Sequence, residues 1–161
     1  MAGDWATANE RAEADFDGTG KDKRMRYVTA YLAAGVTLLV LDVIWLTAMG
    51  STYRRLLDGM LTEGFRLAPA AIFYFIYVAG IVTLAVAPAM DAGAGWQTAA
   101  IKGGVLGFVA YATYDLTNHA TLKVWPWQLT VVDIAWGSVL TATAAGVAMF
   151  AVERLMGPAN S

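Results

Sequence analysis

The segment that decides the fold reads YVTAYLAAGVTLLVLDVIWLTAMG and covers residues 27–50. Asp42 is the one charged side chain in it. The hydrocarbon core of a bilayer is about 30 Å thick, and a helix needs about 20 consecutive apolar residues to cross it. The segment therefore predicts a transmembrane helix.

Three more segments of this kind follow along the chain, at residues 67–90, 98–118 and 127–152. A helix on the surface of a soluble bundle carries a polar stripe along one side, and these segments lack such a stripe. Consecutive spans cross a bilayer in alternating directions. The sequence thus predicts an all-α fold, an integral membrane bundle of four antiparallel transmembrane helices within residues 27–152.

The first 26 residues have a different composition. Six of the 13 acidic and five of the 11 basic side chains of the chain lie in residues 1–26. This segment lacks the basic start and directly following apolar run of a signal peptide. We predict a disordered cytoplasmic tail here and a short C-terminal tail at residues 153–161. A short amphipathic helix that uses Trp5 and Phe16 is the alternative for the first tail.

The composition excludes several classes of protein. Hydrophobic residues make up 58% of the 161 residues, charged residues 15%, and the formal net charge is −2. A nucleic-acid-binding surface needs a concentration of Lys and Arg that this chain lacks. The absence of cysteine excludes disulfides, cysteine zinc sites, iron–sulfur clusters and thiol catalysis. We expect a lipid bilayer around the protein, no nucleic-acid partner, no metal and no cofactor.

Basic residues indicate how the spans are oriented, since Lys and Arg are more frequent on the cytoplasmic side of a membrane. The side with both termini has six near the span ends and the opposite side has four. The six are Lys21, Lys23, Arg24, Arg26, Lys102 and Arg154, and the four are Arg54, Arg55, Arg66 and Lys123. This bias favours a multi-pass protein of the bacterial inner (cytoplasmic) membrane with both termini in the cytoplasm.

Three acidic residues lie inside the apolar segments, namely Asp42, Asp115 and Asp133. A carboxylate at the centre of a transmembrane helix costs about 2.5–3.5 kcal/mol on insertion scales, so such residues point to function. At 1.5 Å per residue, they fall about 12, 6 and 9 Å below the non-cytoplasmic ends of their predicted spans. We therefore expect these three carboxylates to meet in one layer of the bundle.

Aromatic and polar side chains surround this predicted layer. Trp45 follows Asp42 by three residues and Trp136 follows Asp133 by three, so each Trp shares a helix face with its Asp. Tyr and Trp can donate hydrogen bonds to a carboxylate. The other members of the candidate binding site are Tyr111, Asn118 and His119 around Asp115, and Tyr74 and Tyr77 at comparable depth on the second span.

Two of the three acidic residues lie in similar sequences. LDVIW at residues 41–45 and VDIAW at residues 132–136 share an apolar-Asp-apolar-x-Trp pattern. The two segments belong to antiparallel spans, as in an inverted repeat, in which binding sites form between the related elements. Chance similarity between short apolar segments is the alternative explanation.

These motifs carry a resemblance. Together with YATYDLTN at residues 111–118, ATL at 120–122 and WP at 125–126, they resemble a small bacterial family of four-span membrane proteins of unknown function. The resemblance covers about residues 26–154. It implies an inner-membrane four-helix protein, and it implies no activity and no site residues.

Two interpretations of the carboxylates remain open. In the structural one, they form hydrogen bonds between helices, each worth about 0.6 kcal/mol on average in a membrane protein. In the functional one, they bind a solute and exchange it for a proton, since burial favours the neutral form of a carboxyl group. The small-residue pairs Gly103/Gly107 and Ala142/Gly146 permit close helix packing, within the bundle or between copies.

Three functions fit these features. The first is a small transporter that binds a small cationic or polar solute at the acidic layer, coupled to protons. The second is a non-catalytic subunit or assembly factor, with a homodimer or a larger membrane complex as its setting. The third is a membrane enzyme, or enzyme accessory, acting on lipid. Enzymatic activity is the least favoured, because the sequence offers no evident nucleophile and a single histidine.

Overall fold

The protein is built from helices in the computed structural model, which describes residues 4–57, 59–60, 64 and 66–157, with the backbone alone for residues 4–19. The elements are α1 (Asp4–Leu56), α2 (Leu67–Ile81), the π-helical turn η1 (Val82–Val86), α3 (Ala87–Asp91), α4 (Trp96–Thr121) and α5 (Trp127–Met156). The described residues form no strand, and the predicted all-α fold is confirmed.

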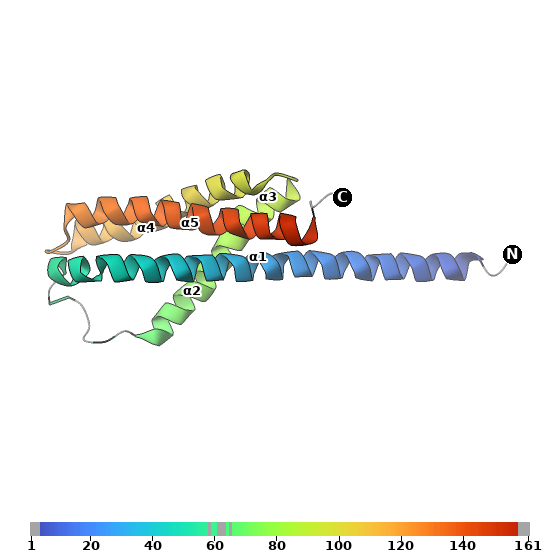
Figure 1. Cartoon of the computed structure of the whole chain (residues 1–161), viewed down its shortest axis with the longest axis horizontal. Coiled ribbons are helices and arrows are strands. Elements are labelled where there is room, and N and C mark those ends of the chain that lie inside the picture. Colours follow the sequence, from blue (N-terminus) through green and yellow to red (C-terminus); the bar gives the residue numbers. More distant parts are fainter. Residues whose placement is uncertain (1–3, 58, 61–63, 65, 158–161) are drawn as a thin grey trace.

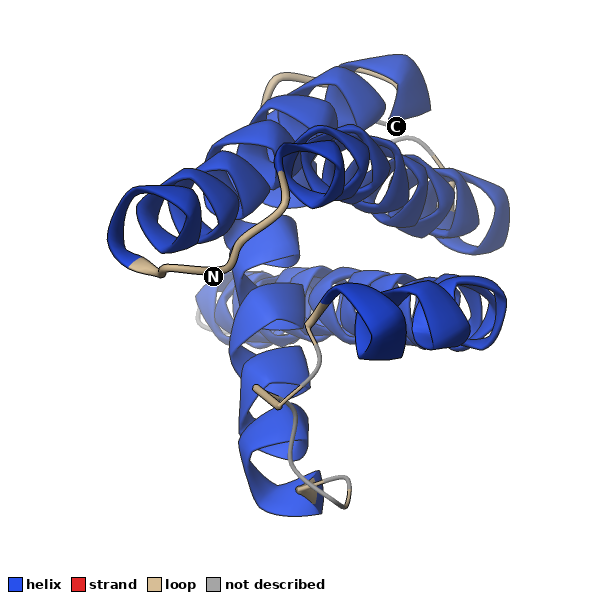
Figure 2. Ribbon diagram, turned by 90° about the vertical axis from the view of Figure 1, so that its left-hand side faces the viewer, coloured by secondary structure: helices blue, strands red, loops and turns tan. Residues whose placement is uncertain are grey.

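Four helical rods make up the bundle, because α2, η1 and α3 continue into one another (Figure 1). Helices α4 and α5 lie antiparallel and pack along each other, and α1 lies beside α5. The α2–α3 rod crosses α1 obliquely (Figure 2). The core forms where this rod meets the other three helices, and its fully buried residues there include Ile81, Ala85, Val86 and Ala89.

The π-helical turn has a local cause in the sequence. Pro88 has no N–H to donate to the carbonyl of Leu84, and its ring would crowd that carbonyl in a regular α-helix. The wider turn η1 occupies the residues just before this proline. It marks the part of the rod that enters the core, since Val82, Ala85 and Val86 within it are buried.

Glycines let α4 and α5 approach closely. A Cβ atom on Gly107 would collide with the Gly137 carbonyl oxygen, and one on Gly103 would lie 2.6 Å from the Ala145 Cβ. Gly137 itself lies against the ring of Tyr111. The first predicted small-residue pair therefore acts within the bundle.

Three helical segments, Gly20–Leu56, Leu67–Asp91 and Trp127–Met156, are long and apolar enough to cross a membrane. Helix α4 is not among them, because polar residues such as Lys102 and Asp115 lower its hydropathy. It nevertheless runs the length of α5 between the same two ends of the bundle (Figure 1). Its position supports the predicted fourth span.

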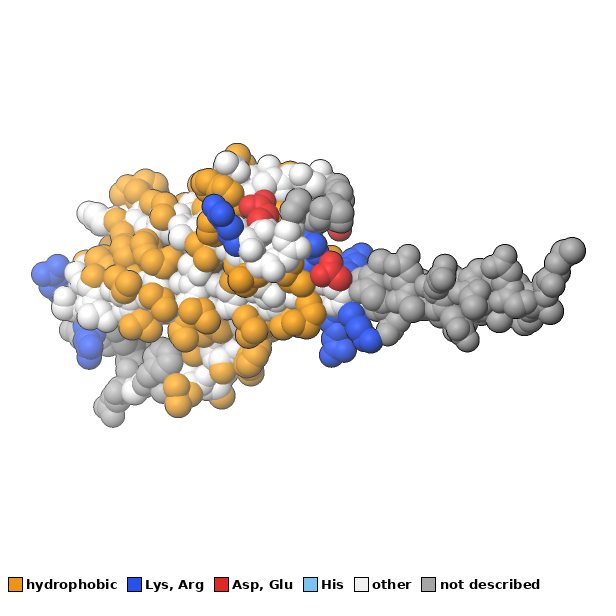
Figure 3. Space-filling view, turned by 45° about the vertical axis from the view of Figure 1, so that its right-hand side comes forward, with side chains coloured by type: hydrophobic (Ala, Val, Ile, Leu, Met, Phe, Trp, Pro, Cys, Tyr) orange, Lys and Arg blue, Asp and Glu red, His pale blue; other side chains and the backbone are white. Residues whose placement is uncertain are grey.

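The surface suits a bilayer. Apolar side chains cover the middle of the molecule, and Lys and Arg gather toward its two ends (Figure 3). We call the end where α1 finishes and α5 begins the loop end, and the end where α5 finishes and α4 begins the termini end. Arg26 joins two helices at the termini end, because its guanidinium donates to the carbonyl oxygens of Met156 and Gly157 at 2.9 and 3.0 Å.

Helix α1 is longer than the predicted span at both ends. It begins at Asp4, within the segment predicted as a tail, and it continues beyond Gly50, the predicted end of the first span, to Leu56. Once a helix exists, each added residue costs little, and residues 1–26 include five Ala and three Arg, which favour helix. Helix α5 likewise extends four residues beyond its predicted end, to Met156.

Candidate functional site

The two Asp-x-x-Trp motifs meet in the structure. Because α1 and α5 run antiparallel, Trp45 and Trp136 stack with ring centroids 4.4 Å apart and an angle of 6° between their planes. Each Asp lies three residues from its Trp, but in opposite directions along the bundle. Asp133 is therefore on the loop-end side of the indole stack, and Asp42 is on the termini-end side.

Tyr53 links the stack to Asp133. Its hydroxyl donates to the Asp133 Oδ1 at 2.5 Å and accepts a hydrogen bond from the Trp45 Nε1 at 2.9 Å. Sequence reasoning missed Tyr53, because we expected the first span to end at Gly50. The signal was its spacing: Asp42, Trp45 and Tyr53 fall on one helix face, three and then eight residues apart.

Asp115 is the most unusual residue of this region. Its side chain is 0% exposed, and neither carboxylate oxygen has a hydrogen-bond partner. It interacts electrostatically with Asp133 and Tyr53. An isolated buried carboxylate is costly, and native proteins normally satisfy such a group. The site can relieve this cost by holding a proton on Asp115 or a cation beside it.

Asp42 has a separate set of partners. The Tyr74 hydroxyl donates to the Asp42 Oδ2 at 2.7 Å. The Trp136 indole N–H lies near this carboxylate, but its geometry is outside that of a hydrogen bond, and the buried Nε1 has no partner. The Trp45 N–H on α1 thus lies on the side of Asp133 from α5. The Trp136 N–H on α5 lies on the side of Asp42 from α1.

The remaining predicted tyrosines lie between these groups. Tyr77 and Thr141 share a hydrogen bond of 2.9 Å. Thr141 donates its own hydrogen to the Gly137 carbonyl at 2.7 Å, so Tyr77 is the donor in their pair. Tyr111 is half-buried and interacts electrostatically with Asp42. Tyr77 and Thr141 lie on the termini-end side of the stack, and Tyr111 lies against Gly137, beside Trp136.

Two predicted site residues lie apart from the carboxylates. His119 is exposed, and its Nδ1 lies 3.1 Å from the Trp125 carbonyl oxygen while its ring meets the Trp127 ring edge-on. Asn118 is half-buried and interacts with Tyr114. Both belong to the end of α4, and neither forms a hydrogen bond with the three aspartates in the described part of the chain.

The three carboxylates do not share one layer. At 1.5 Å per residue, Asp133 lies about 9 Å from the start of α5, and Asp115 lies about 9 Å from the end of α4. Asp42 lies about 21 Å from the end of α1, because this helix continues six residues beyond its predicted end. We call Asp115 and Asp133 the loop-end carboxylates and Asp42 the central carboxylate. Within the described residues, no three His, Cys, Asp or Glu side chains are placed to hold a metal ion.

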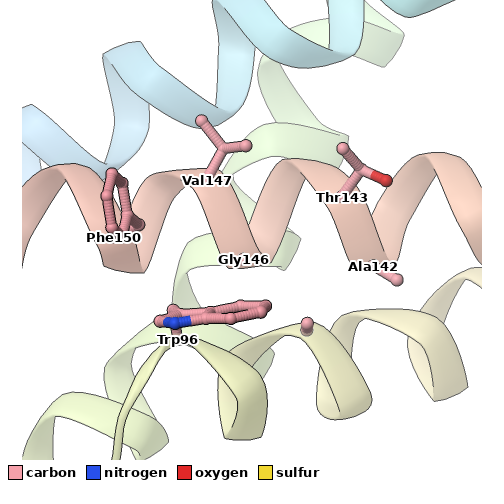
Figure 4. Close-up of a pocket in the computed structure, with 7 residues that line it drawn as sticks. Trp96, Ala142, Thr143, Gly146, Val147 and Phe150 are labelled. Atoms are coloured by element: carbon pink, nitrogen blue, oxygen red, sulfur yellow. The ribbon is translucent and has the colours of Figure 1, made fainter.

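A groove of about 430 Å³ lies between α4 and α5, away from these residues (Figure 4). The Trp96 ring lies beneath Gly146 in it, and Val147 and Phe150 form another part of its wall. Ala142 and Gly146, the second predicted small-residue pair, both line it. The groove is apolar and includes none of the candidate site residues.

Apolar helices around a set of buried ionisable side chains define an integral membrane protein with a polar interior. Residues 27–150 match the family described as "Predicted membrane protein (DUF2177)", and the chain belongs to this family. No curated protein and no solved structure shows a match.

Proposed function

We propose that this protein binds a small cationic or polar solute at the loop-end carboxylates and exchanges it for a proton. The observation that carries the proposal is Asp115, which is fully buried with both oxygens unpartnered beside Asp133. A carboxyl group in this state accepts either a proton or a cation, and the two compete for the same oxygens.

The neighbouring contacts support a binding role over a purely structural one. Asp133 is held by Tyr53, which gives it a fixed position, whereas Asp115 forms no hydrogen bond that would contribute to packing. No Lys or Arg forms an ion pair with either residue in the described part of the chain. Two carboxyl groups without a resident counter-charge favour a cationic solute.

Transport assays test the proposal. Purified protein is placed in proteoliposomes loaded with a pH-sensitive dye, and sodium, potassium or methylammonium is added outside. We expect wild-type vesicles to release protons from the lumen with one of these cations as it enters. Asp115→Asn and Asp133→Asn should lower the rate of proton release to that of protein-free vesicles, because the amide of asparagine does not bind or release a proton near neutral pH.

Asp91→Asn is the matched control, because Asp91 is exposed at the end of α3. Its rate should equal that of the wild type. Unchanged rates in both loop-end variants would contradict the proposal.

The groove between α4 and α5 favours a second candidate, a non-catalytic subunit or assembly factor of a membrane complex. Its apolar surface and small residues suit a helix of a partner or of a second copy. The same variants separate the two functions. A subunit role predicts that Asp115→Asn lowers the yield or the assembly of a complex, with no proton exchange in wild-type vesicles.

A further inference from the structure

The central carboxylate, Asp42, is separated from Asp133 along the bundle. Trp45 and Trp136 stack between it and Asp133, and each Asp is about 4.5 Å along the helix axis from its Trp. The two carboxylates are therefore about 9 Å apart along the bundle, on opposite sides of the stack. No hydrogen bond joins them in the described part of the chain.

A mostly apolar groove lies beside Tyr74, the hydrogen-bond partner of the central carboxylate. It lies between α1 and α2, has a volume of about 210 Å³, and is lined by Tyr31, Gly35, Leu39, Ala71, Tyr74, Phe75 and Val78. Tyr31 lies at its termini-end side, where its hydroxyl donates to the Phe75 carbonyl at 3.0 Å. Tyr74 belongs both to the groove and to the pair with Asp42. Two hydroxyl groups, those of Tyr31 and Tyr74, therefore belong to this groove.

We propose that Asp42 and Tyr74 form a second proton-binding position, entered along the α1–α2 groove from the termini end, and that the Trp45–Trp136 stack separates it from the loop-end carboxylates. The inference rests on the proposed function only in assigning both positions to one exchange process. The position, its access and the separation are testable without transport.

The groups that face Asp42 favour a proton over a larger ligand. They are Tyr74 and Tyr77 from α2, Tyr111 from α4 and Trp136 from α5. All are neutral, none is cationic, and Tyr74 already donates to one carboxylate oxygen. A proton that reaches the Tyr74 oxygen lets this hydroxyl pass its own hydrogen to the Asp42 Oδ2. The tyrosine is neutral before and after the step, and the carboxylate gains one proton.

Thiol labelling tests the access route, and the natural chain has no cysteine to interfere. Leu39→Cys and Val40→Cys form a matched pair, because they are neighbours at one depth with exposed fractions of 50% and 52%. Leu39 lines the groove, and Val40 does not. A membrane-impermeant methanethiosulfonate reacts with thiolates, which hydrocarbon disfavours. We expect Leu39→Cys to react at least about tenfold faster than Val40→Cys when the reagent is on the side of the termini.

The same variant tests the separation by the indole stack. With both Trp residues intact, reagent on the loop side should not label Leu39→Cys. Adding Trp136→Ala should make this cysteine reactive from the loop side, while Trp136→Phe, which keeps a ring in the stack, should not. Circular dichroism of each variant establishes that the helices are retained.

Two results would overturn the inference: equal labelling of Leu39→Cys and Val40→Cys, or labelling of Leu39→Cys from the loop side with the stack intact. Neither depends on flux. A protein that shows no proton exchange but the expected labelling would contradict the proposed function and leave the separated position in place.

Discussion

Tyr53 shows how one hydroxyl can organise a buried carboxylate. It satisfies Asp133 and receives the indole N–H of Trp45, so three side chains from two helices hold one another in place. Asp115 has no equivalent partner although it lies in the same region. The two carboxyl groups thus differ in that Asp133 has a hydrogen-bond partner and Asp115 has none.

Replacing Tyr53 with Phe removes the hydroxyl and leaves the ring. We expect a loss of about 1–2 kcal/mol in unfolding free energy, because Asp133 and Trp45 both lose a hydrogen-bond partner. Unfolding in mixed detergent and dodecyl sulfate micelles, followed by circular dichroism, measures it. Tyr27→Phe is the control, since Tyr27 forms no hydrogen bond in the described part of the chain, and its stability should match the wild type. An equal loss in both variants would count against the role of Tyr53.

Helices α4 and α5 depend on glycine where they touch. The sequence pattern of Gly103 and Gly107 predicts a close approach, and the structure places both against the backbone or small side chains of α5. Gly80 on α2 is not at a close helix contact, because nothing lies within 4 Å of where its Cβ would be. Gly103 and Gly107 therefore have no room for a side chain, whereas Gly80 has.

The substitutions Gly107→Ala and Gly80→Ala should have opposite effects. A Cβ at Gly107 pushes the helices apart, and overpacking of this kind costs about 1–3 kcal/mol. At Gly80 the new methyl meets open space, and alanine favours helix over glycine by up to about 1 kcal/mol. Thermal unfolding of the two variants and of the wild type measures both changes in stability. A Gly107→Ala protein as stable as the wild type would show that α4 and α5 do not pack as described.

The whole molecule is an antiparallel bundle in which α4 is the least apolar of the four predicted spans. Three residues that lower its hydropathy are buried. They are Asp115, Gly103 and Gly107, and the two glycines pack against α5. The buried face of α4 can carry polar residues because it is away from lipid, whereas Ile101, Val105 and Phe108 on its surface are more than half exposed and apolar. The low hydropathy of α4 is therefore consistent with a span that packs one face against α5 and exposes apolar side chains on the other.

Labelling of single cysteines at the two ends of α4 tests the fourth span. Ala92→Cys lies in the turn before α4, and Val124→Cys lies in the connection after it. If α4 crosses the bilayer, an impermeant thiol reagent should label these two positions from opposite faces of sealed vesicles. The bias of basic residues predicts that Ala92→Cys is on the cytoplasmic face. Labelling of both cysteines from one face would rule out the four-span topology.

Sequence alone established the helical membrane class, the approximate spans and the aspartates inside them, because a bilayer imposes a length on apolar segments and a cost on each buried charge. It also placed each Trp on the face of its Asp. It could not reveal Tyr53, since that depends on where α1 ends. The tertiary structure alone decided which partners each carboxylate has. Asp42 and Asp133 lie on opposite sides of the indole stack because antiparallel helices point the same motif in opposite directions, and Asp115 is unpartnered because packing of α4 against α5 buries it.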